Sequence, residues 1–203
     1  ADLNRIIEGI KAAGTQADYV MVSIHSHQIK RASYTEPDYF CEEFAHKCID
    51  AGACAVWGGG THQLKPVEIY KGRPIFYSLG NFVFETHQVR KLPADFWDKY
   101  GYPDNLTVEE AMNRKTKNGT VGLEVDRDNY LSVIAQVEFE RGKLVDVSLI
   151  PVELNFKGGQ DLKGLPAVAS ETDTDSILKR LQEISEEYGT AFEKVDGVIK
   201  VIC

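Results

Sequence analysis

The sequence lacks the features that define several large classes of protein. It contains no run of about 18 apolar residues, so we expect no membrane-spanning helix in it. Its 23 Lys and Arg residues are outnumbered by 31 Asp and Glu residues, and the net charge of −8 makes nucleic acids and anionic membranes unfavourable partners. Because 43% of the 203 residues are hydrophobic and 27% are charged, we expect a folded domain rather than a disordered segment or a coiled coil.

Cysteine is also scarce, and the four that occur, Cys41, Cys48, Cys54 and Cys203, form no Cys-x-x-Cys pair. Cys41 and Cys48 are seven residues apart on one expected helix, which is too far for a disulfide within it. We interpret the cysteines as buried thiols, and free thiols favour a reducing, cytoplasmic environment. The phosphate-binding motif G-x-x-x-x-G-K-S/T is absent, and we find no Ser-His-Asp or Cys-His arrangement suited to nucleophilic catalysis.

The N-terminal part of the chain has the pattern of an α/β sheet. Short apolar runs at 19–24, 54–57 and 74–79 are expected to be buried strands. An amphipathic helix precedes the first strand, and a second helix, capped by Thr35 and ended by Gly52, separates the first two strands. A loop is expected between the last two strands. Helices alternating with short buried strands indicate an α/β fold.

The rest of the chain predicts an excursion and then an antiparallel region. Residues 85–118 are polar and rich in aromatic residues, and we expect one or two short helices there. Residues 119–152 are expected to form three antiparallel strands, with a turn at Arg141-Gly142. A helix capped near Asp173 or Thr174 and a strand at 198–202 follow. We predict a single domain at 1–203, with a site-bearing part at 1–84, the excursion at 85–118, and antiparallel strands with a terminal helix and strand at 119–203.

Histidine is rare, and three of the five histidines lie where expected strands end. His25 and His27 directly follow the first strand, and His62 follows the second strand across a run of glycines. Ligands of open α/β sheets gather beyond the carboxyl ends of the strands, so these imidazoles should converge. Imidazole nitrogens bind Zn, Mn or Fe, and the pattern predicts a divalent metal site made of His25, His27 and His62. The alternative is that they are hydrogen-bonded loop histidines.

Four further residues are candidates for binding a substrate. The backbone of Gly59 and Gly60 can approach a ligand closely and offer amides to an anion, although a turn that only positions His62 explains them equally well. Asn81, at the end of the third strand, can orient a ligand or form a turn of its own. Glu68 lies in an alternating segment that places it opposite its apolar neighbours. The basic residues near these candidates, Lys65, Lys71 and Arg73, can form a patch for anions, whereas His46 is expected on a wet helix face with no role.

Two segments of the sequence resemble a known family. The segment DYVMVSIHSH at 18–27 resembles one signature of the CapA family of poly-γ-glutamate capsule synthesis proteins, and 44–85, with YSLGNFVF as its most specific part, resembles the other. The family is similar to calcineurin-like metallophosphatases, so the resemblance implies a sandwich of mixed sheets flanked by helices. It also implies that this chain is the C-terminal part and that the N-terminal half, which supplies the first metal ligands, is missing.

The resemblance carries over to single residues. His25 and His62 match histidines of the family signatures. Gly59 and Gly60 stand where many relatives have histidine, and His27 stands where others have glycine. This departure leaves open whether a dinuclear phosphatase site forms, and the part of the protein represented here is expected to be inactive alone.

Two functions follow from the resemblance. The first is a capsule biosynthesis protein with a metallophosphatase-like site holding Mn, Fe or Zn, which hydrolyses a phosphoester or a linkage of an anionic polymer. The second is a non-catalytic component that binds the polymer or assembles the capsule machinery. Both imply an anionic polymer or phosphoester and other capsule-synthesis proteins as partners. The family suggests the bacterial cell envelope, whereas the free cysteines favour the cytoplasm.

Overall fold

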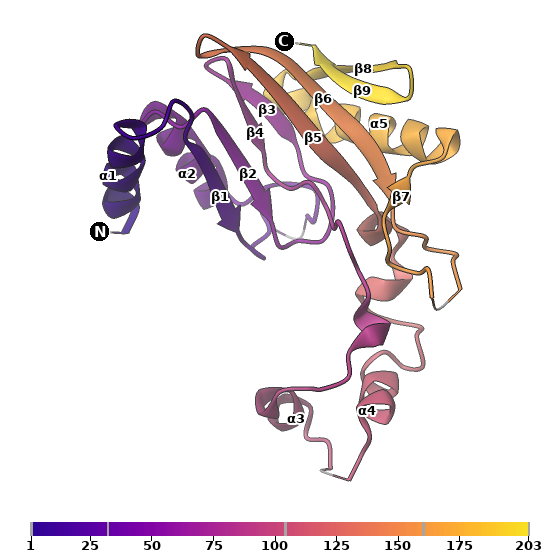
Figure 1. Cartoon of the computed structure of the whole chain (residues 1–203). Helices are drawn as coiled ribbons and strands as arrows, with labels where there is room; N and C mark the ends of the chain where they lie inside the picture. Colours follow the sequence, from indigo (N-terminus) through magenta and orange to yellow (C-terminus); the bar gives the residue numbers. More distant parts are fainter. Residues whose placement is uncertain (1, 32, 104, 160, 203) are drawn as a thin grey trace.

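The computed structural model describes residues 2–31, 33–103, 105–159 and 161–202, and its core consists of two β-sheets with helices packed against them (Figure 1). The first sheet has four strands in the order β1-β2-β4-β3, of which β1, β2 and β4 are parallel and β3 is antiparallel to β4. The second sheet is antiparallel in the order β5-β6-β9-β8, with the short β7 also paired to β6. This mixed α/β architecture confirms the expected fold class.

The strands of the first sheet are β1 (Met21–His25), β2 (Ala55–Gly59), β3 (Val67–Tyr70) and β4 (Arg73–Phe76). Those of the second are β5 (Leu131–Glu140), β6 (Lys143–Glu153), β7 (Ala167–Val168), β8 (Ala191–Val195) and β9 (Val198–Ile202). The α-helices are α1 (Asp2–Gly14), α2 (Tyr39–Asp50), α3 (Ala94–Tyr100), α4 (Val108–Lys115) and α5 (Glu171–Ser185). Short 3-10 turns are η1 (Thr86–Gln88), η2 (Leu123–Val125), η3 (Arg127–Tyr130) and η4 (Glu186–Tyr188).

The four-stranded sheet separates two layers of apolar side chains. On one face, residues of β2 and β4 such as Val56 and Ile75 pack against Cys48 and Ile49 of α2 and against α1. On the other face, side chains of β3 and β4 pack against the five-stranded sheet and α5. Burial of these apolar side chains is the main term that holds the two sheets together. The carboxyl ends of β1 and β2 therefore lie at one end of a rigid, two-sided core.

The expected loop between the second and third strands was wrong, because it contains β3. Val67 and Ile69 alternate with Glu68 on this strand, and the turn at Lys71-Gly72, with both residues at positive φ, returns the chain into β4 as a hairpin. The helix start at Thr35 was also wrong. Pro37 disfavours a helical conformation in the residue before it, so α2 begins after the N-cap Asp38, whose side chain accepts from the Phe40 amide.

The antiparallel region differs from the prediction at both ends. Only two strands, β5 and β6, form within 119–152, and the chain before them turns through η2 and η3. Asp126 caps η3 by accepting from the Asp128 amide, which replaces strand pairing with a local hydrogen bond. The strand β8 was not expected. The terminal helix begins earlier than predicted, because Ser170 rather than Asp173 or Thr174 caps α5.

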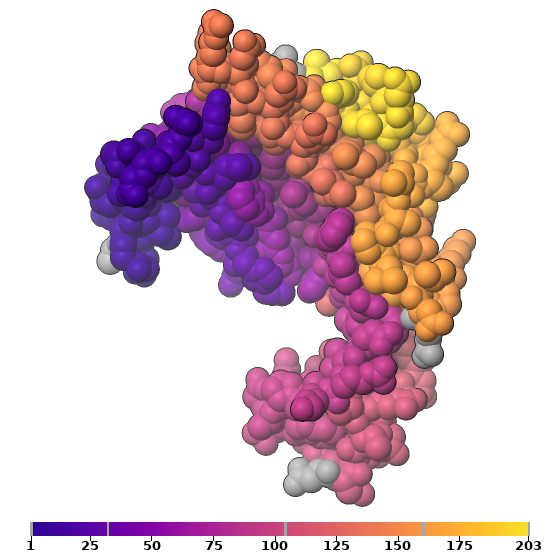
Figure 2. All heavy atoms as spheres, in the orientation of Figure 1, coloured from indigo at the N-terminus to yellow at the C-terminus, as the bar shows by residue number. Residues whose placement is uncertain are grey.

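The excursion carries two short α-helices, α3 and α4, as expected, and stands away from the sheets (Figures 1 and 2). The capping box of α4 joins Thr107 and Glu110, and an aromatic group around Phe96 and Tyr100 holds α3 to its flanking loop. Within the described part of the chain, none of the helices has both the length and the apolar character needed to cross a membrane.

Candidate functional site

His25 and His27 face each other at the carboxyl end of β1. Their Nε2 atoms are 3.0 Å apart, and both side chains are exposed to solvent. Residues on a strand alternate between faces, so while Ile24 and Ser26 line a cavity on the α2 side, His25 and His27 lie together on the opposite side. One Nε2 must donate to the other unless both nitrogens bind a cation.

His62 lies beside this pair, on the loop after β2. Its ring centroid is 5.8 Å from that of His27, and its Nδ1 is 3.0 Å from Oδ1 of Asn81. The Asn81 amide donates through Nδ2 to the backbone oxygen of Asn129, which can only accept. The Asn81 oxygen is therefore the acceptor, His62 donates from Nδ1, and Nε2 of the neutral ring keeps its lone pair. We call His25, His27 and His62 the imidazole cluster.

The imidazole cluster fits two positions of a metal site. Two nitrogens at about 2.1 Å from one ion, with an angle of 90–109° between them, lie about 3.0–3.4 Å apart, which matches the His25–His27 spacing. Among the described residues, however, no group of three or more His, Cys, Asp or Glu side chains is placed to hold a metal ion. The structure thus brings the three predicted ligands side by side, but it provides a pair of nitrogens at ligand spacing rather than a complete set.

The glycine run allows the strand ends to approach closely. A Cβ on Gly60, whose φ is +112°, would lie 2.7 Å from the backbone oxygen of Ser26, and one on Gly58 would lie 2.3 Å from that of Tyr77. A Cβ on Gly59 would meet nothing within 4 Å. Glycine at 60 is therefore needed to bring the loop of His62 against the loop of His25 and His27, whereas glycine at 58 lets β2 approach the backbone of Tyr77 after β4. The predicted anion contact of Gly59 and Gly60 stays a prediction.

Glu68 does not join the imidazole cluster. In the register of the sheet, Glu68 pairs with Ile75 on β4, and Ile75 pairs with Val56 on β2. His25 pairs with Gly59, which is three residues after Val56, so Glu68 is about 10 Å from His25 along the strand direction. Both of its carboxylate oxygens are 2.9 Å from Nε2 of His46, and one accepts from the Tyr77 hydroxyl at 2.7 Å. Glu68 therefore lies beneath α2 and apart from the imidazole cluster, and its predicted substrate contact stays a prediction.

His46 was expected on a solvent-exposed helix face without a role, but its side chain contacts two other residues. Besides the Glu68 carboxylate, its ring stacks on Tyr70 with centroids 4.0 Å apart. Burial and the Glu68 carboxylate both raise the pKa of Tyr77 far above its ordinary value. We call His46, Glu68 and Tyr77 the His46 network. The contact between His46 and Glu68 spans 22 residues, so no local pattern signalled it.

The predicted basic patch does not form. Lys65 is 3% exposed, and its ammonium donates to the backbone oxygen of Glu36, so burial lowers the pKa of this lysine. Lys71 pairs with Asp50 at the far turn of the β3–β4 hairpin, and the Arg73 guanidinium lies over the ring of Phe139. None of the three is positioned to recruit an anion to the imidazole cluster.

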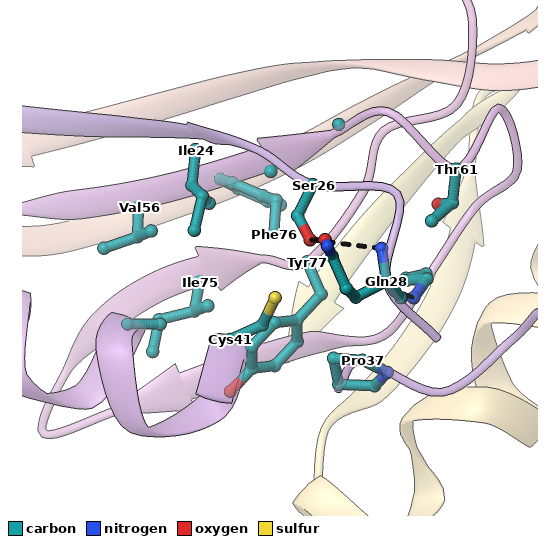
Figure 3. Close-up of a pocket in the computed structure, with 14 residues that line it drawn as sticks. Ile24, Ser26, Gln28, Pro37, Cys41, Val56, Thr61, Ile75, Phe76 and Tyr77 are labelled. Atoms are coloured by element: carbon teal, nitrogen blue, oxygen red, sulfur yellow. Dashed lines mark hydrogen bonds between the residues drawn. The ribbon is translucent and has the colours of Figure 1, made fainter. Parts of the chain in front are cut away.

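A small cavity of about 20 Å³ lies between the ends of β1 and β2 and the first turns of α2 (Figure 3). Ser26 and Thr61, each next to a histidine in sequence, line it together with Cys41 and Lys65. The volume suits a single water, and the Thr61 hydroxyl is buried with no hydrogen-bond partner in the part of the chain that the structure describes. Burial raises the pKa of the Cys41 thiol and raises that of Cys48 to about 11, as expected for buried thiols. The fourth cysteine, Cys203, lies outside the described residues.

A larger hollow that the sequence did not signal lies between the excursion and the body of the molecule. The space in it that water can occupy is about 880 Å³, and Tyr130 forms part of its wall. The ring of Phe84 contacts both Tyr130, in the wall of this hollow, and His62 of the imidazole cluster. Its charged lining is mixed and consists of His87, Arg90 and Lys163 with Glu109, Glu124 and Asp161.

The fold and the site define an α/β protein with imidazoles gathered at the ends of parallel strands. Comparison with known proteins gives its family: residues 1–86 match the family described as bacterial capsule synthesis protein PGA_cap. An uncharacterized protein of Sinorhizobium fredii is 35% identical over 97% of this chain and 44% of its own length. The PGA biosynthesis protein CapA of Bacillus subtilis is 41% identical over 44% of this chain and 23% of its own length.

A probable polyglutamine synthesis accessory protein of Mycobacterium tuberculosis is 25% identical over 78% of this chain and 32% of its own length. The chain belongs to the CapA family of capsule synthesis proteins. It spans less than half of the length of these relatives.

Proposed function

We propose that this protein takes part in the synthesis of a poly-γ-glutamate capsule and that its imidazole cluster binds a divalent metal ion next to an anionic substrate. The names of the relatives from Bacillus subtilis and Bacillus anthracis, both called CapA, support the role in capsule synthesis. The observation that carries the metal site is the 3.0 Å spacing of the His25 and His27 Nε2 atoms. Other capsule-synthesis proteins are the expected partners.

Each residue of the cluster has a distinct role in this proposal. His25 and His27 hold the metal through Nε2, and the backbone of β1 and β2 keeps their rings together. His62 faces the substrate: with Nδ1 donating to Asn81, its Nε2 can accept a proton or, once protonated, donate to an anionic oxygen. A bound metal would supply a water with a pKa lowered toward about 7, suited to hydrolysing a phosphoester or a polymer linkage.

A second function is favoured by the incomplete ligand set. Only two nitrogens among the described residues are at ligand spacing, which is enough for a metal-bridged contact with a carboxylate but not for a tightly held catalytic ion. The protein would then bind the polymer without cleaving it. A bridging cation would also overcome the repulsion between a polymer of negative charge and a chain of net charge −8.

Calorimetric titration with Zn²⁺, and separately with Mn²⁺, tests the proposal. We expect one binding site in the wild-type chain and a loss of affinity of more than about 100-fold in His25→Ala and His27→Ala, because changes to residues that merely support ligands already cost 10–100-fold. His87→Ala, which removes an imidazole of the excursion, is the matched control and should bind as the wild type does. Equal affinity in all four proteins would contradict the metal site.

Turnover of p-nitrophenyl phosphate and retention on immobilised poly-γ-glutamate, both measured on the full-length protein, then separate the two functions. Metal-dependent turnover that His62→Ala abolishes supports the hydrolase. Metal-dependent retention without turnover supports the binding component. Neither activity in a metal-loaded protein would contradict both.

A further inference from the structure

His62 has an unusual backbone conformation for a residue with a side chain. Its φ is +66°, in the left-handed region that non-glycine residues seldom adopt. Such a conformation is strained and persists only where the surroundings hold it. The Asn81 contact holds the ring of His62, but another group must hold the backbone on the other side of the residue.

The next residue, Gln63, is fixed by two contacts from the opposite layer. Its side chain is buried, and its Nε2 donates to Oδ2 of Asp126 at 2.8 Å. Its Oε1 accepts from Nη2 of Arg180 at 3.0 Å. Both functional atoms of the amide are therefore paired, and the amide cannot rotate without breaking a buried hydrogen bond.

Arg180 is itself held firmly. It lies on α5, 117 residues after Gln63, and its side chain is 16% exposed. Its other terminal nitrogen, Nη1, pairs with the Asp128 carboxylate. Because α5 packs into the core between the two sheets, the guanidinium has a fixed position relative to the loop that carries His62.

We propose that Arg180 is a positioning residue for His62. By fixing Gln63, it keeps the neighbouring His62 in the left-handed conformation in which Nδ1 meets Asn81 and Nε2 stays available beside His27. The role of the imidazole as a metal or substrate contact rests on the proposed function, whereas the control of its conformation by Arg180 does not.

Side-chain nitrogen NMR of the histidines in the full chain tests this proposal directly. In the wild type, we expect His62 to be a single tautomer with its proton on Nδ1. Arg180→Ala should mix the two tautomers of His62 and leave those of His46 unchanged. Gln63→Leu, which removes the contacts with both Arg180 and Asp126, should mix the tautomers at least as much, and adding Arg180→Ala to it should change nothing further, because Arg180 acts through Gln63.

Two matched variants separate positioning from general stability. Asp128→Asn removes the ion pair that helps to hold Arg180 but leaves its contact with Gln63, so the tautomer of His62 should change much less than in Arg180→Ala. Lys179→Ala alters the neighbouring residue, whose side chain is 77% exposed, and should have no effect. The proposal is overturned if His62 keeps its single tautomer in both Arg180→Ala and Gln63→Leu, or if Asp128→Asn changes it as much as they do.

Zn²⁺ affinity provides the link to function. We expect about a 10-fold loss in Arg180→Ala, because the ring of His62 lies against the ligand His27 and a displaced His62 would disturb that ring; 10-fold is the low end of the loss seen for residues that support a ligand. If the wild type binds no Zn²⁺, the proposed metal site fails while the tautomer measurement still decides the role of Arg180. If the wild type binds Zn²⁺ and Arg180→Ala binds it equally well with an unchanged tautomer, the positioning role fails alone.

Discussion

The imidazole cluster and the His46 network use the same side chain in opposite ways. In the His46 network, the imidazole meets both oxygens of Glu68, and the carboxylate also accepts from Tyr77. In the imidazole cluster, the rings of His25 and His27 meet each other, and among the described residues no carboxylate pairs with them or with His62. An imidazole that is hydrogen-bonded to a carboxylate stabilises the fold. Exposed imidazoles that contact only one another remain available to bind a cation.

The position of each group in the sheet explains this difference. The His46 network lies on a sheet face that α2 covers, where an unpaired polar group is costly and partners are selected for stability. The imidazole cluster lies where β1 and β2 end, and there the chain leaves the ladder and exposes its side chains. Variants that alter one of the two regions and leave the other unchanged test this difference.

The largest effect is expected from Gly60→Ala. The positive φ and the approach to the Ser26 oxygen leave no room for a Cβ, so we expect a loss of about 2–3 kcal/mol in the free energy of unfolding. The loops of the imidazole cluster should separate, which would also weaken Zn²⁺ binding. Urea unfolding and calorimetric titration measure the two effects.

Gly59→Ala is the matched control, because a Cβ there meets nothing within 4 Å. It should change the stability by less than about 1 kcal/mol and leave metal binding intact. Equal losses in the two variants would mean that the approach of the strand ends does not build the site.

A smaller effect, confined to the other region, is expected from Glu68→Gln. The change weakens the charged hydrogen bonds to His46 and Tyr77, and we expect a loss of about 1–2 kcal/mol in the free energy of unfolding. Zn²⁺ affinity should stay as in the wild type. A Glu68→Gln protein with normal stability but weakened Zn²⁺ binding would show that the carboxylate serves the site after all.

The smallest effect is a dependence of stability on alkaline pH. Burial and nearby carboxylates raise the pKa of Tyr77 and of Tyr188, so the folded protein keeps protons that the unfolded chain releases above its tyrosine pKa of 10.0. The stabilising contribution is therefore complete below pH 10 and declines as the pH rises beyond it.

Tyr77→Phe should reduce the decline in unfolding free energy between pH 10 and pH 11, measured by urea unfolding. Tyr19→Phe, which alters an exposed tyrosine, should leave the decline unchanged. If Tyr77→Phe unfolds with the same pH profile as the wild type, the Tyr77 hydroxyl does not hold its proton as the structure indicates.

Local patterns predicted the parts of the site that are close in sequence. The run from Tyr19 to Ile24 signalled a strand, and this placed His25 at the end of β1 and His27 just beyond it. The expected burial was wrong, because β1 is an edge strand on which exposed and half-buried residues alternate. The glycine run at 58–60 signalled a backbone that can take a positive φ, and Gly60 does so at +112°. Its predicted close approach to a ligand stays a prediction. Contacts between side chains of different layers could not be predicted from any local pattern in the sequence.

Glu68 illustrates what a single strand pattern cannot show. Alternation correctly separated it from Val67 and Ile69, but its partner depends on α2, which covers that face of the sheet. Likewise, Arg180 reaches Gln63 only because α5 packs between the sheets, and a hydrogen bond across 117 residues has no sequence period.

The central claim is that His25 and His27 together bind one metal ion, and X-ray absorption spectroscopy of the zinc-loaded chain tests it most directly. The account predicts two imidazole nitrogens on the zinc at about 2.0–2.1 Å in the wild type and one fewer in His27→Ala. A zinc spectrum with no imidazole nitrogens, or one that His27→Ala leaves unchanged, would contradict it.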